Sequence, residues 1–343
     1  MRKLLNTLYV TSPDSYLSLD GENVVVYRDE AEVIRVPLHN LEGITALGYT
    51  GASPALMGAC AQRNIALCFL TPHGRFLARV TGGVRGNVIL HKTQYLISED
   101  KDACTSIAQN MLIGKLFNAR WVLERATRDH ALRLDVEKIK RASQFIQNAV
   151  VRVQACGDLD GLRGYEGEAA SVYFNVFDDL ILQQKEAFQF LSRNRRPPMD
   201  NVNAMLSFVY TLLAGDMAAA LETVGLDPYV GFLHRDRPGR ASLALDMMEE
   251  LRPVCADRFV LSLINRREVS AGGFRAQENG AVTMDDATRK TMLASWQARK
   301  QETLTHPFLK EKIPWGLVPY VQALLLARFL RGDLDAYPPF LWK

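Results

Sequence analysis

The chain has 343 residues, of which 48% are hydrophobic and 23% are charged, and its formal net charge is +3. This length is sufficient for two domains, and the composition excludes a disordered chain. The five cysteines form no CxxC pair, which argues against a disulfide framework and against a zinc site. The apolar stretch at the N-terminus is too short and too interrupted for a signal peptide or a membrane span. We therefore expect a cytoplasmic protein with no membrane role.

The first part of the chain has a β-type pattern. Short runs such as LNTLYV, NVVVYRD and EVIRVPL are rich in Val, Ile, Leu and Tyr and are separated by turn residues. Gly21 lies between two such runs and predicts a hairpin, because a tight loop needs a positive φ. Ser53 and Pro54 predict the start of a helix that continues to about Arg63, followed by two more strands.

From about Leu96 the apolar residues recur at helical spacing, and we expect at least seven helices. Asp200 is a plausible N-cap of one of them, Gly225 is its C-terminal stop, and Pro253 should kink another. The predicted fold class is α+β. A small N-terminal β domain covers residues 1–88, a linker covers 89–98, and a larger all-α catalytic and DNA-binding domain covers 99–343.

The glycine-rich segment 81–86 is too irregular to hold phosphates and is interpreted as part of a linker between domains. No GxxxxGK[ST] motif occurs in the chain, so we expect no nucleotide cofactor.

Glu166 lies between two glycines just inside a predicted helix. Gly164 and Gly167 each cost roughly 1 kcal/mol relative to alanine in a helix interior. Either close helix packing or the close approach of a ligand would explain them.

Two further segments carry polar residues in apolar surroundings. His234 follows Phe232 and Leu233 in a loop and is surrounded by arginines. Asp246 and Glu249 are three residues apart, so they share a helix face and repel each other unless a cation lies nearby. That cation is either a divalent metal or an arginine such as Arg240 or Arg252.

Taken together, the carboxylates and the imidazole suit Mg²⁺ or Mn²⁺. Arginines next to such a metal would contact the phosphates of a nucleic acid, which favours phosphodiester chemistry. The candidate DNA-binding residues are Arg163, Arg193, Arg195, Arg196, Arg235, Arg237 and Arg240.

These segments, in this order, resemble the core DNA integrase of CRISPR adaptation. That family has a glutamate in an LRG-(aromatic or Ile)-EG helix, found here as Leu162–Gly167. It has a histidine after a G-F-aliphatic loop and an aspartate about a dozen residues later, here His234 and Asp246. The segment 195–210 and the ending 338–343 are also similar, and the similarity covers nearly the whole chain. Length and ending are closest to the type I-C subtype.

The resemblance implies a Mg²⁺- or Mn²⁺-dependent site at Glu166, His234 and Asp246. It places Glu249 beside that site at a second acidic position that is often an aspartate, which leaves its direct metal role open. It places Tyr210 near the site as an aromatic residue that contacts the substrate. The implied reaction joins the 3′-hydroxyl ends of a short DNA fragment to the CRISPR array, and the enzyme also cuts branched DNA. The implied partners are double-stranded and branched DNA, a second copy of the chain bound through the β domain, and a small ferredoxin-like CRISPR protein.

Two other functions remain open. One is a nuclease specific for branched DNA that uses the same metal for hydrolysis in DNA repair. The other is a DNA-binding scaffold without activity, in which the acidic residues only pair with arginines. The histidines without an acidic partner motif are interpreted as structural or surface residues, and they are His39, His73, His91, His130 and His306.

Overall fold

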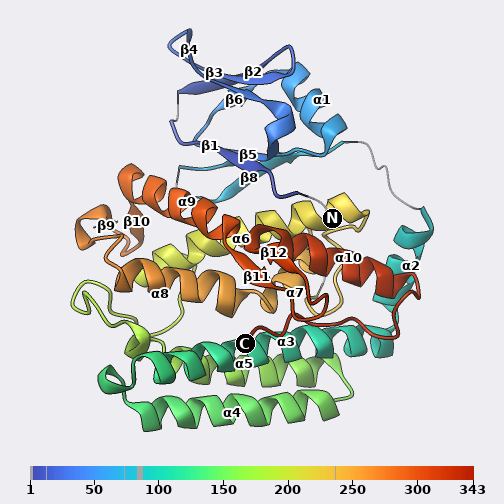
Figure 1. The fold of residues 1–343 in the computed structure, drawn as a ribbon, viewed down its shortest axis with the longest axis vertical. Helices are drawn as coiled ribbons and strands as arrows, with labels where there is room; N and C mark the ends of the chain where they lie inside the picture. The colour runs from blue at the N-terminus through green and yellow to red at the C-terminus, as the bar shows by residue number, and fades with distance from the viewer. Residues whose placement is uncertain (1–2, 13, 73, 83–87, 236) are drawn as a thin grey trace. The chain divides into compact units, whose positions relative to one another are not determined.

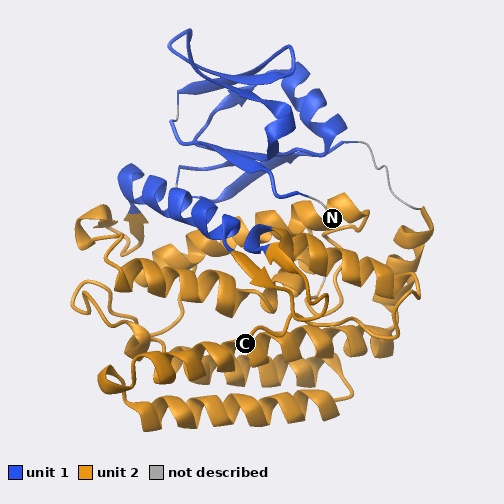
Figure 2. Cartoon of the chain, in the orientation of Figure 1, with its two compact units in different colours: residues 1–85, 284–302, 314–316 blue, residues 86–283, 303–313, 317–343 orange. Residues whose placement is uncertain are grey.

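The computed structural model describes residues 3–12, 14–72, 74–82, 88–235 and 237–343. The chain divides into two compact units (Figure 2). Unit 1 contains residues 1–85, 284–302 and 314–316, and unit 2 contains residues 86–283, 303–313 and 317–343. Most of the segment predicted as a glycine-rich linker, residues 83–86, lies outside the described residues.

Unit 1 contains two four-stranded sheets, ordered β1-β5-β7-β8 and β4-β3-β2-β6. The pairs β1–β5, β5–β7 and β2–β6 are parallel, whereas β7–β8, β2–β3 and β3–β4 are antiparallel. The strands are β1 (Asn6–Val10), β2 (Ser15–Asp20), β3 (Asn23–Arg28), β4 (Ala31–Pro37), β5 (Leu41–Leu47), β6 (Gly51–Ala52), β7 (Ala66–Leu70) and β8 (Phe76–Val80) (Figure 1).

The predicted hairpin and the predicted helix of the β domain are both confirmed. Gly21 has a φ of +58° between β2 and β3. Helix α1 (Pro54–Arg63) begins after Ser53, whose hydroxyl accepts the N–H of Leu56. Leu17, Ile44, Leu56 and Leu67 are fully buried, so α1 and strands of both sheets share one core.

Unit 2 is mainly helical, which confirms the predicted order of a β domain followed by an α domain. Its helices are α2 (Val88–Glu99), α3 (Lys101–Asp129), α4 (Val136–Ala155), α5 (Leu159–Asn175), α6 (Asn201–Val224), α7 (Ser242–Glu249), α8 (Arg258–Asn265) and α10 (Val318–Leu330). Helices α3, α4 and α5 pack against one another, and α6 packs against α7 and α10. Each of α3, α5, α6 and α7 also lies close to the candidate site described below.

The helix ends predicted for unit 2 are found at the predicted residues. The Asp200 carboxylate accepts the N–H of Asn203 and caps α6, and Gly225 ends α6 with a φ of +83°. Pro253 lies in a turn of π-helix, Arg252–Asp257, which separates α7 from α8. The predicted kink is therefore a break between two short helices.

Three features differ from the prediction. The segment 89–98 is not a linker, because it forms most of α2. Unit 2 is not purely helical, since it contains two short strand pairs, β9 (Phe274–Ala276) with β10 (Val282–Met284) and β11 (Thr303–Thr305) with β12 (Lys312–Pro314). The division at residue 88 is also incomplete, because α9 (Asp286–Gln301) belongs to unit 1.

The C-terminal segment is fixed to α3 by buried polar contacts. The amide of Asn118 donates to the carbonyls of Glu250 and Phe340 and accepts the N–H of Trp342 at 2.9 Å. The Glu250 carboxylate accepts the N–H of Phe340 at 2.8 Å and the hydroxyl of Tyr337. Burial raises the pKa of Glu250 to about 7.

In the described part of the chain, one helix, α6, has the length and composition of a membrane span. Of its most apolar window, 61% is buried inside the fold, as in the core helix of many globular proteins.

Candidate active site

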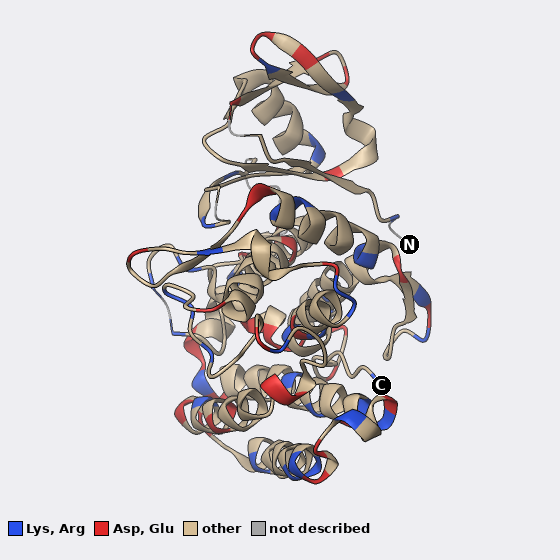
Figure 3. Ribbon diagram, turned by 90° about the vertical axis from the view of Figure 1, so that its left-hand side faces the viewer, with Lys and Arg blue, Asp and Glu red and all other residues tan. Residues whose placement is uncertain are grey.

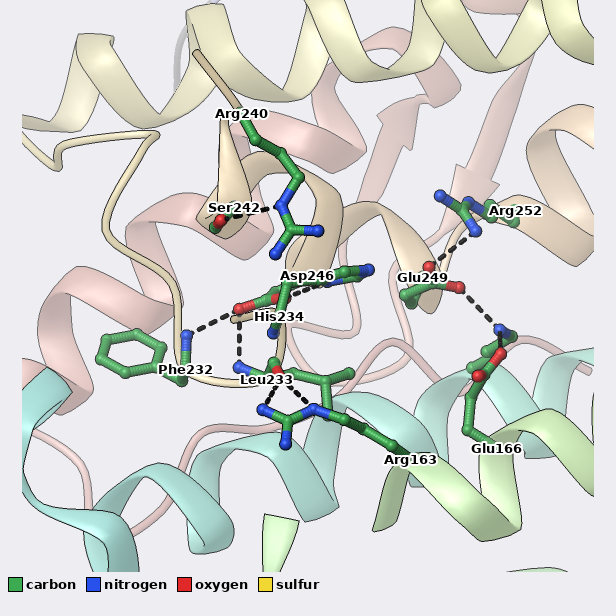
Figure 4. A network of polar contacts seen from close by, with 11 residues as sticks. Arg163, Glu166, Phe232, Leu233, His234, Arg240, Ser242, Asp246, Glu249 and Arg252 are labelled. Atoms are coloured by element: carbon green, nitrogen blue, oxygen red, sulfur yellow. Dashed lines mark hydrogen bonds and ion pairs between the residues drawn. The ribbon is translucent and has the colours of Figure 1, made fainter. Parts of the chain in front are cut away.

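Three helices and one loop of unit 2 bring the candidate residues together (Figure 4). Glu166 lies on α5, and His234 lies in the loop between α6 and α7. Asp246 and Glu249 lie on α7, and Lys115 lies on α3. The sequence predicted all of these positions except Lys115.

Asp246 is fully buried and holds the histidine loop. Its Oδ2 accepts the N–H groups of Phe232 at 2.7 Å and Leu233 at 2.9 Å. Its Oδ1 accepts the N–H of His234 at 3.0 Å and lies 2.5 Å from His234 Nδ1. A Cβ on Gly231 would lie 2.6 Å from Asp246 Oδ2, so only glycine allows this close approach. Asp246 therefore holds the loop through its backbone N–H groups and orients the imidazole of His234 through Nδ1. Nε2 is then the ring nitrogen that faces a ligand.

Arg163 binds the same loop from α5. Its guanidinium donates from Nε to the Leu233 carbonyl at 2.9 Å and from a terminal nitrogen at 2.5 Å. Another nitrogen pairs with Asp160 at 2.6 Å. Since Arg163 and Glu166 are three residues apart on α5, this contact sets the position of His234 relative to Glu166. Arg163 thus positions the histidine loop, and its role in DNA binding stays a prediction.

Glu249 and Glu166 share one ammonium group. Lys115 Nζ pairs with Glu166 Oε1 and lies 2.7 Å from Glu249 Oε2. The other oxygen of Glu249 lies 2.6 Å from Arg252 (Figure 4). Burial opposes ionisation of Glu249, but the charges of Arg252 and Lys115 outweigh it and lower the pKa of this carboxyl. Burial likewise disfavours the charged form of Lys115, yet the two carboxylates raise its pKa.

The three residues predicted as metal ligands do not form a closed set. Within the described ranges, no group of three or more His, Cys, Asp and Glu side chains lies close enough to hold a metal ion. The lone pairs of Asp246 already accept four contacts from the histidine loop. Glu249, predicted as a neighbour of the site, is instead the carboxylate that shares a cation with Glu166.

A divalent cation fits this donor set. Two carboxylates already surround one positive charge. Asp246 supplies the carboxylate that commonly orients a metal-binding histidine from its second nitrogen. Oxygen ligands with one imidazole suit Mg²⁺ or Mn²⁺. Glu166 and Glu249, which share one cation, could therefore supply oxygen ligands to such an ion, and His234 Nε2 is a further candidate donor.

Tyr210 acts on this site through an arginine. Its hydroxyl donates to Asp257 at 2.6 Å, and the guanidinium groups of Arg193 and Arg252 lie 5.2 and 5.0 Å from the centre of its ring. Burial raises the pKa of Asp257 to about 6. Because Arg252 binds Glu249, this cluster fixes the position of a candidate ligand.

The glycines beside Glu166 are not explained by packing. Both Gly164 and Gly167 are exposed on α5, and a Cβ on either would meet no described atom within 4 Å. Of the two explanations that the sequence left open, the close approach of a ligand is the one compatible with this open surface.

The remaining arginines differ in exposure. Arg195, Arg196, Arg235 and Arg237 are exposed, and Arg235 pairs with Asp160 at 3.0 Å. Arg240 is partly buried, and one of its terminal nitrogens has no hydrogen-bond partner among the described residues.

Arg193 donates to Asn203 at 2.6 Å and to Ser207 at 3.2 Å. Its partly buried guanidinium is therefore bound to neighbouring side chains, and its role in DNA binding stays a prediction.

The other histidines lie in varied places. His39 and His130 are exposed, His91 is partly buried, and His306 is fully buried. His73 lies outside the described residues.

Comparisons with known proteins agree with the sequence motifs. A model of the family described as CRISPR associated protein Cas1 matches residues 8–298. The CRISPR-associated endonuclease Cas1 1 of Chlorobaculum tepidum is 51% identical over 343 residues, and the match covers all of both chains. The CRISPR-associated endonuclease Cas1 2 of Rhodospirillum rubrum is 52% identical over 347 residues, again with full coverage of both.

Solved structures share the fold. A casposase bound to its integration product has a TM-score of 0.85 and 21% identity, covering 99% of this chain and 95% of that one. A CAS1 protein from Thermotoga maritima has a TM-score of 0.82 and 19% identity, covering 97% of this chain and 99% of that one. The family resemblance stated from the motifs is confirmed, whereas the type I-C subtype remains a prediction.

Proposed function

The chain belongs to the family of CRISPR-associated Cas1 proteins, and on this premise we propose that it is a metal-dependent DNA integrase and endonuclease. The proposed reaction inserts short foreign DNA fragments into the CRISPR array through attack by their 3′-hydroxyl ends. The observation that carries the proposal is the arrangement of Glu166 and Glu249 around one cation beside the oriented His234.

The side chains of this site would bind and orient the reacting groups. Glu166, Glu249 and His234 Nε2 would hold Mg²⁺ or Mn²⁺, which stabilises the charge that develops on the phosphate during transfer. Asp246 and Arg163 keep His234 in place by holding its loop from both sides. Arg252 keeps Glu249 in place, and Tyr210 supports Arg252.

DNA would reach the site over the open surface of α5. The exposed glycines beside Glu166 allow a phosphate backbone to approach the carboxylate closely. Arg235, Arg237 and Arg240 would bind phosphates without reading base sequence. Exposed Arg195 and Arg196 would do the same farther along the DNA.

The proposed partners are those of the family. We propose a homodimer formed through the β domain, double-stranded and branched DNA as substrates, and a small ferredoxin-like CRISPR protein as a bridge between two dimers. A solved relative of similar fold, with 22% identity, is described as a Cas6-RT-Cas1–Cas2 complex, which is compatible with such a partner. The reaction would take place in the cytoplasm.

Strand joining tests the proposal directly. The purified protein and the small partner are incubated with a supercoiled plasmid that carries a CRISPR repeat and with a labelled short duplex. Mn²⁺ is compared with EDTA, and a 3′-hydroxyl duplex with a 3′-dideoxy duplex. We expect covalent joining only with Mn²⁺ and the 3′-hydroxyl. Cutting without joining would favour the branched-DNA nuclease, and loss of both would favour the DNA-binding scaffold.

A further inference from the structure

Lys115 occupies the position at which a metal would join the two carboxylates. Its side chain is 12% exposed, that of Glu166 is 29% exposed and that of Glu249 is 4% exposed. Glu249 Oε2 lies 2.7 Å from Nζ, so the ammonium pairs with both carboxylates at once. The ammonium therefore neutralises this pair of carboxylates in the place that a cation ligand would take.

The charges of the four side chains that pair directly with one another balance without a metal. Lys115 and Arg252 carry two positive charges, and Glu166 and Glu249 carry two negative charges. A divalent cation added to this set would leave an excess of two positive charges in a largely buried place, which is unfavourable. Two DNA phosphates would restore the balance.

We propose that Lys115 is an internal cation that a divalent metal displaces from between Glu166 and Glu249, so that stable metal binding requires DNA. This inference rests on the proposed function, because it assigns the metal to the same carboxylates. Lys115 has a long flexible side chain and carries its charge at one point, so its ammonium can move from a carboxylate to a phosphate oxygen. In the metal-free protein, the same residue keeps the two carboxylates from repelling each other.

Metal binding to single-residue variants tests the role of Lys115. Free Mn²⁺ is measured by electron paramagnetic resonance at constant pH, with and without a short DNA duplex. Lys115→Met should bind Mn²⁺ without DNA about tenfold more tightly than the unmodified protein, a typical size of coupling between two sites. DNA should raise the Mn²⁺ affinity of the unmodified protein by a similar factor and that of Lys115→Met by much less.

Two further variants serve as controls. Lys140→Met removes an exposed lysine that pairs with Glu124, and its Mn²⁺ affinity should be unchanged. Lys115→Arg keeps the positive charge and forms more hydrogen bonds to carboxylates, so it should bind Mn²⁺ more weakly than the unmodified protein. This variant tests the proposal even if Lys115→Met does not fold.

The outcomes separate this inference from the proposed function. Mn²⁺ affinity that is unchanged or lower in Lys115→Met, or unchanged in Lys115→Arg, would overturn the displacement by metal while leaving strand joining intact. If the Mn²⁺ affinities are as predicted but the protein joins no DNA strands, the integrase function is overturned and the role of Lys115 is retained. If no variant binds Mn²⁺ in either condition, the inference fails.

Discussion

Asp246 and Glu249 lie on the same helix with the same charge, but their surroundings give them different roles. Asp246 accepts contacts from the histidine loop, whereas Glu249 faces Lys115 and Arg252. Their spacing in the sequence predicted a shared face and the need for a cation. It could not show which carboxylate faces the cation, because the partners come from segments far away in the chain. Lys115 itself was not predicted, since a single lysine within a long helix carries no distinguishing signal.

The two acidic residues should respond differently to removal of charge. Asp246→Asn places an amide against backbone N–H donors, so we expect the free energy of unfolding to fall by about 1–3 kcal/mol. Glu249→Gln should lose most Mn²⁺ binding in the presence of DNA with a smaller loss of stability. Urea unfolding and Mn²⁺ titration of both variants measure these effects. Equal loss of Mn²⁺ binding in two equally stable variants would contradict the assignment of Glu249 as the ligand.

The ends of several helices could be predicted from the local sequence alone. Ser53, Asp200 and Gly225 are found at the predicted helix ends, because capping depends on neighbouring residues. The predicted linker over 89–98 was wrong for the opposite reason. Gln94 is buried in α2 and donates to the carbonyls of Asp227 and Val230, more than 130 residues later. Such long-range contacts have no local signature.

Alanine at Gly164 should separate folding from DNA binding. A Cβ there meets open space on α5, so we expect Gly164→Ala to raise the free energy of unfolding by up to about 1 kcal/mol. The same methyl group should weaken DNA binding and strand joining, because DNA would approach this face. Gly215→Ala, also helical and in open space, serves as the control that changes stability alone. Unchanged DNA affinity in Gly164→Ala would argue against DNA contact at this face.

His306 should make the segment before α10 sensitive to acid. Its Nδ1 accepts the N–H groups of Phe308 and Leu309 at 3.3 Å, and its Nε2 lies 3.1 Å from the Gln322 amide oxygen. Burial lowers the pKa of His306 from 6.5 to about 4. The unfolded chain therefore takes up a proton first as the pH falls. The contribution of His306 is complete above pH 6.5 and is lost between pH 6.5 and 4, by about 3 kcal/mol.

Urea unfolding at a series of pH values checks that the stability from His306 is lost as the pH falls. His306→Asn keeps an acceptor and a donor but does not titrate, so its stability should fall less steeply between pH 6.5 and 4. Parallel pH curves for the two proteins would show that His306 is not the titrating group.

At the scale of the whole molecule, the net charge alone does not identify a DNA-binding face. The formal net charge of the chain is only +3, and acidic and basic residues are intermixed along the helices of unit 2 (Figure 3). DNA affinity must then come from local groups such as the exposed arginines around residues 195 and 235. The sequence predicted the order of a β domain and an α domain, but not that α9 belongs to unit 1. That membership depends on tertiary contacts such as the pair between Lys300 and Glu42.

Salt dependence of DNA binding should distinguish exposed from internal arginines. Arg195→Ala should reduce the slope of log affinity against log salt concentration by about 1, because one phosphate contact is lost. Arg193→Ala should leave the slope unchanged, since its guanidinium binds Asn203 and Ser207. Fluorescence anisotropy with a labelled duplex at several salt concentrations gives both slopes. A slope that falls in Arg193→Ala and stays unchanged in Arg195→Ala would show that Arg193 contacts DNA.

Strand joining by two matched glutamate variants tests the proposed site most directly. Glu166 pairs with Lys115, whereas Glu168, two residues later on the same helix, is exposed and pairs with Arg152. In the Mn²⁺-dependent plasmid assay, Glu166→Ala should abolish covalent joining of the 3′-hydroxyl duplex, and Glu168→Ala should retain nearly all of it. Joining that persists in Glu166→Ala, or that is lost equally in both variants, would contradict a catalytic site at Glu166.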